Sequence, residues 1–487
     1  MKKTLKYTTL AALAAFAAGA IPAYAETLSL DYTKTSSGSS QDITVPSIYT
    51  PEVTEITASD DLDLTYTVEG GTVFDTTKDF TVNDVTVSAT TSGKVWGHEF
   101  LNIGKETTTT FNSLNYTLNT WGENPNTTIR LNEGSTFTVN KDIIYKAAAA
   151  QNEINFFFMG NVNSTLNVGG NIELLAPAKA TTNLNLQFHS YDVNIGGVIK
   201  LNNNASMKRI QLDNASTANT EKTYNRSFGG LSVNNGGQLR IEGTANNTVN
   251  LTFTNSTEES YSGYLMTKAD STGNKFNIAM NAATAAGKQT LRFTDVPTET
   301  KFDGANYNNA AIDTVSVSNG TLSLGMNSAM SANKLIVNGE KAVFDITSVD
   351  GASEIGRATF GSFEGTKGAI AFDIAESNDF LDITGTANVS SDFAFIVNMT
   401  KADFDSFLGE GETSLQYNII SFTTEGSSFD ATTVICSDSQ LKGKIDLFDI
   451  AGTTSVMLTI AAVPEPATVA AILGAAALAF AAYRRRK

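Results

Sequence analysis

The central part of the chain alternates between apolar and polar residues. In the segment NTTIRLNEGSTFTVN, the apolar positions Ile129, Leu131, Phe137 and Val139 fall on one side of an extended chain. A period of two predicts β-strands that bury one face. Clusters of Asn, Gly, Ser and Asp separate these runs and predict turns. No segment of this central part has strong helical periodicity, so the expected fold class is all-β.

A loose unit recurs along this pattern: two alternating apolar positions, a tight Gly or Asn turn, and two further apolar positions. The units are LNVGGNIEL (166–174), VNIGGVIKL (193–201), LSVNNGGQLRI (231–241), VSVSNGTLSL (315–324) and the longer LIVNGEKAVFDI (335–346). The intervals between them vary, so they form no strict repeat. Units that cannot bury a face alone gain stability by stacking. The pattern predicts an irregular parallel β-helix, in which Asn side chains at turns hydrogen-bond to the same residue type one coil away.

Two features leave the architecture open. Gly-Gly and Asn-Gly turns between four-residue arms also fit β-hairpins, so an antiparallel β-sandwich is the alternative. From about residue 355 the strands become longer and more aromatic. We therefore expect a β-solenoid body at 26–354 and a closing β unit at 355–462, because an open solenoid end exposes unpaired strand edges.

The net charge of the chain limits the classes of partner that are expected. The 487 residues carry a formal net charge of −17, and both ends are cationic, so the middle is more acidic still. Such a surface repels nucleic acid and anionic lipid, and no nucleic-acid partner is expected. A single cysteine, Cys436, excludes an intramolecular disulfide and a cysteine metal cluster. We expect Cys436 to be a buried strand residue.

The segment 1–25 has the pattern of a secretory signal peptide. Lysines near the start are followed by an apolar stretch at 10–21, and Ala23 and Ala25 then form an A-x-A site before Glu26. The stretch is shorter than the roughly 20 residues that a membrane span needs. We expect a signal helix that signal peptidase removes, with a permanent membrane anchor as the alternative.

The other end carries three features in a fixed order. They are the motif at 463–466 with Pro464, Glu465 and Pro466, an apolar segment at 467–483, and a basic tail of Arg484, Arg485, Arg486 and Lys487. By the positive-inside rule, the tail would stay in the cytoplasm and stop transfer of an apolar transmembrane helix. Proline fixes φ and removes a donor, so the motif stays extended, which is the backbone form that a protease cleft needs.

Motif, apolar segment and basic tail in this order resemble the PEP-CTERM sorting signal of Gram-negative bacteria. The resemblance covers 463–487 and implies that Pro464, Glu465 and Pro466 are recognised by an exosortase, a membrane transpeptidase-like enzyme that cuts near them. The body would then pass from the inner membrane to the outer surface or to extracellular polysaccharide. A plain single-span anchor is the alternative. The units NGTLSL and GGQLRI are also similar to passenger repeats of autotransporter-type proteins.

Candidate catalytic and metal-binding residues are sparse. The histidines His98 and His189 are far apart in the sequence and are expected to be structural. Acidic residues occur close together as Asp60, Asp61 and Asp63 in SDDLDL and as Asp379 and Asp382 in SNDFLDI. Their oxygen atoms suit Ca²⁺, but neither segment matches a known calcium loop, so solvated turn acids are expected.

Enzyme motifs are missing from the sequence as well. There is no HExxH, GxSxG, P-loop or dinucleotide fingerprint. A β-helix polysaccharide lyase would need acids and arginines grouped in an external groove. The arginines of the body show no grouping; they are Arg130, Arg209, Arg226, Arg240, Arg292 and Arg357. We therefore expect no catalytic residue, no metal and no cofactor.

Together these patterns predict an exported, acidic β-protein of the cell surface or extracellular matrix that acts as an adhesin or structural scaffold and is not an enzyme. Its partners would be signal peptidase, an exosortase-type enzyme, the inner membrane before processing, and extracellular polysaccharide. A β-helix enzyme acting on polysaccharide is the first alternative. An ice- or surface-binding module is the second; it needs a flat Thr array, and TTTT at 107–110 is expected to be a tract rather than a ladder.

Overall fold

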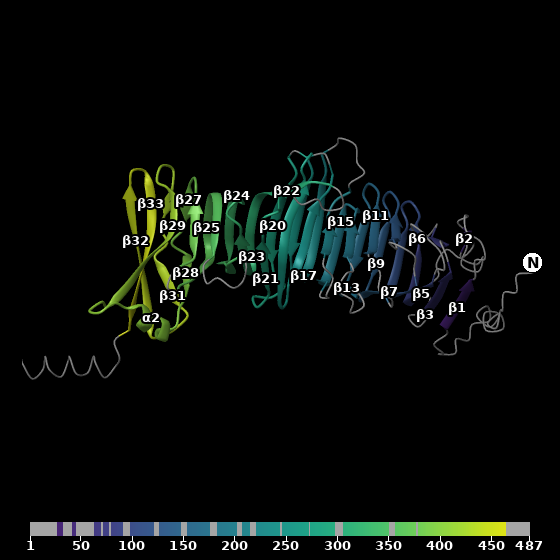
Figure 1. The fold of residues 1–487 in the computed structure, drawn as a ribbon, viewed down its shortest axis with the longest axis horizontal. Helices are drawn as coiled ribbons and strands as arrows, with labels where there is room; N and C mark the ends of the chain where they lie inside the picture. Colours follow the sequence, from purple (N-terminus) through teal and green to yellow (C-terminus); the bar gives the residue numbers. More distant parts are fainter. Residues whose placement is uncertain are drawn as a thin grey trace, which may run out of the picture.

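The computed structural model is an elongated array of stacked β-strands (Figure 1). It describes residues 27–32, 41–44, 63–69, 72–76, 79–90, 98–120, 126–147, 153–175, 183–201, 207–214, 221–243, 246–271, 273–297, 305–349, 356–375 and 378–463. The expected signal helix at 1–25 and the expected transmembrane helix at 467–483 lie outside these ranges.

Parallel pairing between strands that are far apart in the sequence builds three stacks. The first contains β1 (Thr27–Tyr32), β3 (Asp63–Glu69), β5 (Phe80–Thr90), β7 (Thr108–Thr120), β10 (Ile143–Ala147), β13 (Ile172–Leu175), β15 (Asp192–Lys200) and β17 (Thr223–Ile241). It continues through β19 (Glu258–Lys268), β21 (Lys288–Phe293), β23 (Ala311–Met326), β24 (Ala332–Ile346), β25 (Arg357–Asp373), β28 (Phe393–Asn398) and β31 (Thr433–Cys436).

The other two stacks use shorter strands and further segments of the long ones. The second contains β2 (Gln41–Thr44), β4 (Thr72–Thr76), β6 (His98–Ile103), β8 (Asn126–Leu131), β11 (Glu153–Gly160), β14 (Asn183–Phe188) and β16 (Met207–Gln211), and ends on β17 and β19. The third joins β5, β7, β15, β17, β23, β24 and β25 to β9 (Thr136–Val139), β12 (Thr165–Val168), β18 (Thr248–Phe253), β20 (Lys275–Asn281), β26 (Phe380–Ile383), β27 (Ala387–Val389), β29 (Ser414–Thr423) and β30 (Ser428–Phe429).

Antiparallel pairing between the described strands occurs at two places only. The short strand β22 (Tyr307–Asn309) lies against β19, and β33 (Thr453–Ala462) lies between β29 and β32 (Leu441–Ile450). The predicted parallel β-solenoid is therefore confirmed, and the antiparallel sandwich is wrong for the body of the chain. The Gly-Gly segments are corners between stacks, as between β12 and β13, and not hairpin turns.

Close approach of neighbouring coils explains the glycines at these corners. A Cβ on Gly229 would lie 2.0 Å from the carbonyl oxygen of Gly196, and one on Gly196 would lie 2.7 Å from that of Gly169. A Cβ on Gly169 would in turn lie 2.1 Å from the carbonyl oxygen of Asn140. The backbone of each coil thus occupies the space that a side chain on the next coil would need.

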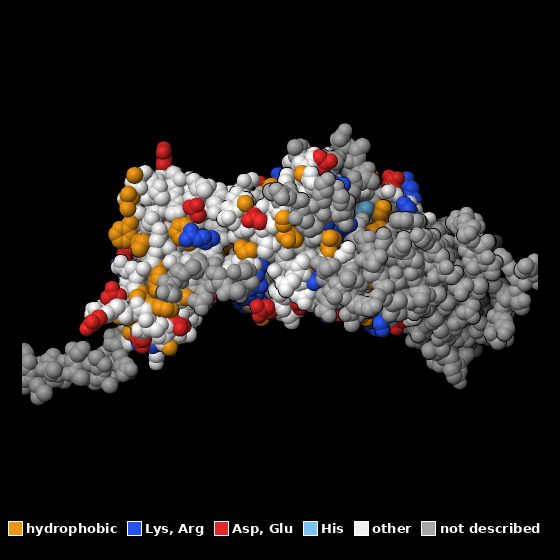
Figure 2. Space-filling model, viewed as in Figure 1, with side chains coloured by type: hydrophobic (Ala, Val, Ile, Leu, Met, Phe, Trp, Pro, Cys, Tyr) orange, Lys and Arg blue, Asp and Glu red, His pale blue; other side chains and the backbone are white. Residues whose placement is uncertain are grey.

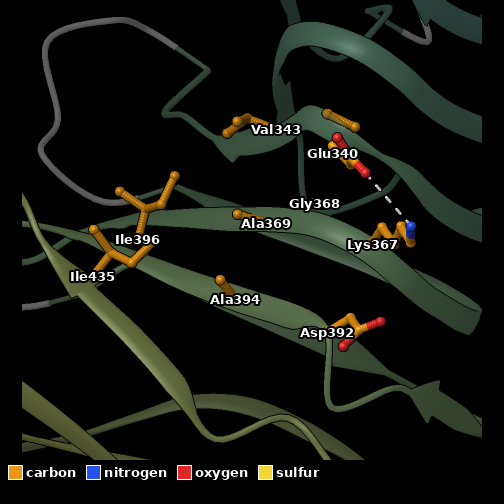
Figure 3. Close-up of a pocket in the computed structure, with 10 residues that line it drawn as sticks. Glu340, Val343, Lys367, Gly368, Ala369, Asp392, Ala394, Ile396 and Ile435 are labelled. Carbon is orange, nitrogen blue, oxygen red and sulfur yellow. Dashed lines mark ion pairs between the residues drawn. The ribbon is translucent and has the colours of Figure 1, made fainter.

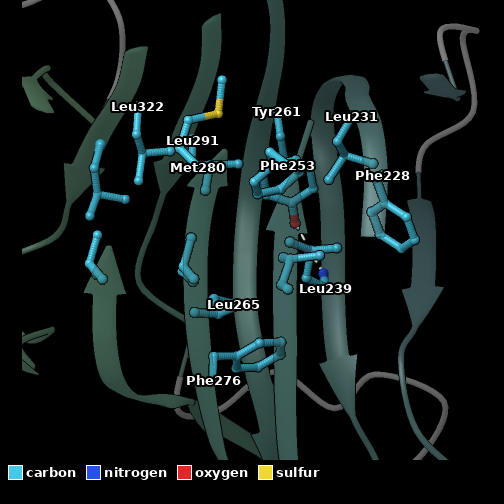
Figure 4. Packing of buried hydrophobic residues seen from close by; sticks show 14 of the residues in the cluster. Phe228, Leu231, Leu239, Phe253, Tyr261, Leu265, Phe276, Met280, Leu291 and Leu322 are labelled. Atoms are coloured by element: carbon cyan, nitrogen blue, oxygen red, sulfur yellow. Dashed lines mark hydrogen bonds between the residues drawn. The ribbon is translucent and has the colours of Figure 1, made fainter. Parts of the chain in front are cut away.

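The core runs along the inside of the array. The alternation found in the sequence becomes an inward-outward alternation, and buried Leu, Ile, Val and Phe side chains form one continuous cluster from Val85 to Ile460. Figure 4 shows part of it, with Phe228, Leu239 and Phe253 directed into the space that the strands enclose. Rings stack from coil to coil; for example, the ring centroids of Tyr116 and Tyr145 are 5.0 Å apart.

The stacking continues past residue 355 toward the C-terminal end. Strand β25 pairs in parallel with β24, and β28 and β31 follow it. The antiparallel strands β29, β33 and β32 then lie at the end of the array, beside the short helix α2 (Lys401–Phe407), whose Phe404 is buried. The expected boundary between a body and a closing unit at 354/355 stays a prediction.

Replacing Gly229 with Ala tests the close contact between coils. The added Cβ has no room beside Gly196, and overpacking of this kind lowers the free energy of unfolding by about 1–3 kcal/mol. Urea denaturation followed by circular dichroism measures the change. Gly409→Ala is the matched control, because its Cβ would meet only the flexible end of Glu412 at 3.1 Å and should leave stability close to that of the parent. Equal stabilities for the two variants would contradict the close contact.

Candidate functional site

Two columns of outward-facing polar side chains run along the third stack. One contains Thr108, Thr136, Thr165, Asp192, Asn225, Asn250, Asn277 and Thr314. The other contains Thr110, Thr138, Asn167, Asn194, Ser227, Thr252 and Ser316, with the apolar Ala279 between the last two. All of these residues are partly or fully exposed. The result is a regular polar face with one residue of each column per coil.

Hydrogen bonds connect members of the first column. Asn225 Nδ2 donates to Asp192 Oδ1 at 2.8 Å, Asn250 Nδ2 to Asn225 Oδ1 at 2.9 Å, and Asn277 Nδ2 to Asn250 Oδ1 at 2.9 Å. These three bonds lie within strands β17, β18 and β20, where the sequence did not predict them. The prediction that Asn bonds to Asn one coil away at turns is confirmed by Asn161, whose Nδ2 donates to Asn132 Oδ1 at 3.3 Å.

The structure corrects the interpretation of the threonine tract. Thr108 and Thr110 stand opposite Thr136 and Thr138 of the next coil, and Thr165 follows one coil further. TTTT therefore supplies one step of a ladder that has two columns, and Thr136 and Thr138 supply the next step. The sequence did not show this because the alignment depends on coil lengths, which differ from one coil to the next.

A second candidate is a charged cluster on the outer side of the second stack. Arg240 on β17 donates from Nη1 to Glu242 Oε1 at 3.1 Å and to the Tyr307 hydroxyl at 3.0 Å. Its guanidinium lies 4.6 Å from the centre of the Tyr307 ring. Arg209 lies on the neighbouring strand β16 and acts electrostatically on both Glu242 and Tyr307. The expectation that the arginines form no grouping is wrong for Arg209 and Arg240.

The electrostatics of this cluster favour fixed charges. Burial alone would raise the pKa of Glu242, but Arg240, Arg209 and Lys268 outweigh it and hold that pKa below its usual value. Burial raises the pKa of Tyr307 to about 12. Because neither group titrates near neutral pH, the cluster is suited to holding β22 against β19 rather than to general acid-base chemistry.

A third candidate lies inside the core. The column of inward positions that runs through Leu166, Val193, Leu251 and Ile278 is apolar apart from Arg226, which occupies the coil between Val193 and Leu251. Arg226 is 1% exposed. A full charge at such a position is costly unless it is fully hydrogen-bonded.

Backbone carbonyl oxygens satisfy the Arg226 guanidinium. Nε donates to Leu212 O at 2.9 Å. The two terminal nitrogens donate to the carbonyl oxygens of Tyr191, Asn225, Phe188 and Ser190 at 2.9, 3.0, 3.1 and 2.9 Å. Burial lowers the pKa of Arg226 to about 10, which leaves it charged at neutral pH. Leu212 and Asn225 belong to the same coil as Arg226, whereas Phe188, Ser190 and Tyr191 belong to the preceding coil. Arg226 therefore joins these two neighbouring coils at this corner.

Asp213 is buried near Arg226 and organises the adjacent turn. It accepts hydrogen bonds from Glu242 N and Gly243 N, both at 2.7 Å, and from Asn247 Nδ2 at 2.9 Å. Burial raises the pKa of Asp213, and these donors oppose the rise. The arrangement is structural, since every partner belongs to the turn that Asp213 holds.

His189 is buried beside Arg226, as its expected structural role requires. Its Nε2 lies 3.0 Å from Gln187 Oε1. Burial, together with the nearby charge of Arg226, lowers its pKa to about 4. For His98 the structure gives the place at the start of β6, but its side chain lies outside the described residues.

The acidic residues at 379 and 382 differ from the expectation of solvated turn acids. Asp379 is buried and accepts hydrogen bonds from Gly356 N and, at 2.6 Å, from Asp373 N. Burial raises its pKa to about 8. Asp382 accepts a hydrogen bond from Ser421 Oγ at 2.8 Å. In the segment SDDLDL, Asp60 and Asp61 lie outside the described residues, and Asp63 is the first residue of β3.

The remaining residues named in the sequence analysis lie partly inside and partly outside the described ranges. Cys436 ends β31 as a strand residue but is only half-buried. Arg357 lies over the Phe380 ring at 5.7 Å. The sorting residues Pro464, Glu465 and Pro466, the tail from Arg484 to Lys487, and the cleavage-site residues from Ala23 to Glu26 all lie outside the described residues. Val463, the last described residue, is 42% exposed and follows β33 directly.

An open hollow of ≈ 470 Å³ lies over β24, β25, β28 and β31 (Figure 3). Val343, Ala369, Ala394, Ile396 and Ile435 line it. An ion pair between Lys367 Nζ and Glu340 Oε1, at 3.6 Å, lies at one side. The charged lining residues Glu340, Lys367 and Asp392 all lie at this side of the hollow, and the rest of the lining is apolar.

No family model and no curated protein matches the chain. Within the described ranges, no three His, Cys, Asp or Glu side chains are placed to share a metal ion. In the same ranges, no helix has the length and apolar character that crossing a membrane requires.

Replacing Arg226 with Met should strongly destabilise the fold. The substitution removes the donors of five carbonyl oxygens at a buried corner, and losing such a buried network costs on the order of 3–5 kcal/mol. Urea denaturation measures the loss. Arg357→Met, at an exposed arginine, is the control and should change stability by less than about 1 kcal/mol. Similar effects of the two substitutions would show that the carbonyl contacts contribute nothing.

His189 should make stability depend on acid pH. Its pKa of about 4 in the folded state lies below the value of 6.5 for an unperturbed histidine. The unfolded chain therefore binds a proton first, and stability falls as pH drops from about 6.5 to 4, by about 3 kcal/mol. Urea midpoints at pH 7 and pH 4.5 should show a smaller difference for His189→Gln than for the parent. An identical pH dependence in the two proteins would contradict a buried neutral His189.

Proposed function

We propose that this chain is an exported β-solenoid protein that a PEP-CTERM signal sorts to the cell surface or extracellular matrix, where it acts as an adhesin or structural scaffold. The observation that carries the proposal is the long parallel solenoid, whose third stack carries columns of polar side chains on its outside from β7 to β23. A long rod of this kind presents many equivalent contacts to a polymer or a neighbouring surface.

The polar columns support polysaccharide as a partner. Amide and hydroxyl side chains repeat along the rod at the strand spacing of about 4.8 Å and offer both donors and acceptors. The visible face in Figure 2 carries scattered charges of both signs and scattered hydrophobic side chains, and most of the rest is backbone and other side chains. With a net charge of −17, the protein would favour neutral or cationic glycans over anionic ones.

The position of the sorting motif supports processing. The motif at 463–466 begins with the exposed Val463, which is one residue beyond the end of β33, and Pro464 follows it. A processing enzyme that works there would meet extended chain beside the folded rod, while the apolar segment and basic tail hold the chain in the inner membrane.

A polysaccharide-cleaving enzyme is the second candidate, because Arg209, Arg240 and Glu242 form the kind of arginine-acid group that such chemistry uses. Against it, Arg240 is fully buried and Tyr307 lies over its guanidinium. Incubating the protein with neutral and uronate-containing polysaccharides distinguishes the two functions. Binding without new reducing ends or unsaturated sugars supports the scaffold, and new chain ends support the enzyme. An ice- or surface-binding module on the Thr108–Thr165 ladder stays the other alternative.

Mass spectrometry of the C-terminus tests the sorting proposal. In cells that export the protein, the mature chain should lack 467–487, and the double variant Pro464→Ala/Pro466→Ala should keep the tail and remain in the inner membrane. Pro177→Ala, at a proline far from the motif in the sequence, is the control and should be processed normally. A full-length tail on the parent protein would contradict sorting by cleavage.

A further inference from the structure

The C-terminal end of the array has a strand with one unpaired edge. Strand β32 pairs in register with β33 along one side, and no described strand is in register with its other side. The side chain of Val434 on β31 packs on Gly443, in the first half of β32. Strand β32 carries Leu447, Phe448 and Ile450, which are 47%, 53% and 73% exposed. Figure 2 shows hydrophobic side chains gathered at the end of the molecule where Figure 1 places β32 and β33. Such an edge is a template for a further strand.

The hydrogen bonds to β33 fix which backbone groups of β32 face outward. Val463 N donates to Gln440 O at 2.7 Å, and the register runs without a shift from Leu441 opposite Ala462 to Ile450 opposite Thr453. In an antiparallel pair, alternate residues bond to the same neighbour. The even-numbered residues of β32 therefore bond to β33, and the N–H and C=O groups of odd-numbered residues such as Ile445 point to the free edge.

The charges of β32 are divided between its two halves. Lys442 and Lys444 lie in the first half, and Asp446 and Asp449 lie in the second. Two copies of such a strand complement each other when they run antiparallel. A parallel pairing in register would instead place each lysine against the same lysine of the other copy.

The outward-pointing backbone groups of the two copies must meet if the strands are to pair at this edge. Odd-numbered residues of one copy must therefore face odd-numbered residues of the other, which leaves few antiparallel registers. When Ile445 faces Ile445 of a second copy, Lys444 of each copy stands opposite Asp446 of the other, and Lys442 stands opposite Phe448. A shift by one step in either direction places Lys444 against Lys444, or Asp446 against Asp446. Only the register centred on Ile445 avoids both repulsions and forms two cross-strand ion pairs.

We propose that β32 is the edge through which two copies of this chain associate, antiparallel and centred on Ile445. The sheet formed by β29, β33 and β32 would then continue into the same three strands of the second copy, and two rods would join at their C-terminal ends. In this arrangement Phe448 lies beside Lys442 of the second copy, and Ile450 lies beside Gln440. The inference holds whether or not the sorting signal is processed.

The competing role for Lys442 and Lys444 is to prevent association at this strand edge. Lys444 Nζ already contacts Asp446 Oδ1 of its own strand at 2.6 Å, and charged side chains at an edge commonly prevent association. Under that role the protein is a monomer, and reversing a charge leaves it a monomer. The two roles therefore predict different masses in solution.

Sedimentation velocity of the full chain in mild detergent tests the proposal. The parent should sediment as a dimer, and Lys444→Asp should weaken the dimer at least tenfold because it places Asp against Asp446. The double variant Lys444→Asp/Asp446→Lys should restore the dimer, since the swapped charges complement each other again. Lys105→Asp, at an exposed lysine far from β32, is the matched control and should leave the dimer intact. A monomeric parent, or a double variant that stays as weak as the single one, overturns the proposal.

Cysteine cross-linking tests the register. With Cys436 replaced by Ser, Lys444→Cys and Asp446→Cys are made on separate chains. Residues 444 and 446 would occupy a position without direct hydrogen bonds, where Cα atoms lie about 4.5 Å apart, within reach of a disulfide. A disulfide-linked dimer should form when the two chains are co-expressed and not with either chain alone. Cross-linking of either chain alone overturns the register centred on Ile445.

Discussion

The fold depends on hydrogen-bonded stacking of each coil on the next. A single coil of this chain has strands of only a few residues and cannot enclose its own apolar side chains. When coils stack in parallel register, inward positions such as Phe137, Leu166 and Val193 follow one another and form a continuous core. The outward positions follow one another in the same way, so the polar face is a consequence of the same register.

Stacking also explains the two least ordinary features of the molecule. At the corners, the backbones of neighbouring coils approach so closely that Gly169, Gly196 and Gly229 leave no room for a Cβ. At another corner the carbonyl oxygens of two neighbouring coils converge, and the guanidinium of Arg226 satisfies them. These carbonyl oxygens converge only when the coils are stacked. Arg226 therefore contributes to the stability of the fold only once the neighbouring coils are in place.

The sequence was sufficient for the fold class but not for the groups that the coils bring together. The alternation around Ile129 and Leu131 predicted strands, and the Asn-rich turns predicted the bonds between coils at turns, because both signals are local. Arg209 and Arg240, or Thr110 and Thr138, become neighbours only through coil lengths that vary: the hydrogen-bonded column from Asp192 to Asn277 has steps of 33, 25 and 27 residues. For the same reason the burial of Asp379 could not be inferred, since its donors Gly356 and Asp373 are supplied by another strand and its flanking loop.

Disulfide trapping between adjacent coils tests the parallel stack most directly. In a Cys436→Ser background, Asn225→Cys and Asn250→Cys occupy neighbouring places in one column, at a spacing of about 4.8 Å that a disulfide can span. Asn225→Cys and Asn277→Cys are two coils apart, about 9.6 Å, which a disulfide cannot span. The account predicts rapid oxidation of the first pair and none of the second within the folded protein. Failure of the first pair, or equal oxidation of both pairs, would contradict the stacked solenoid.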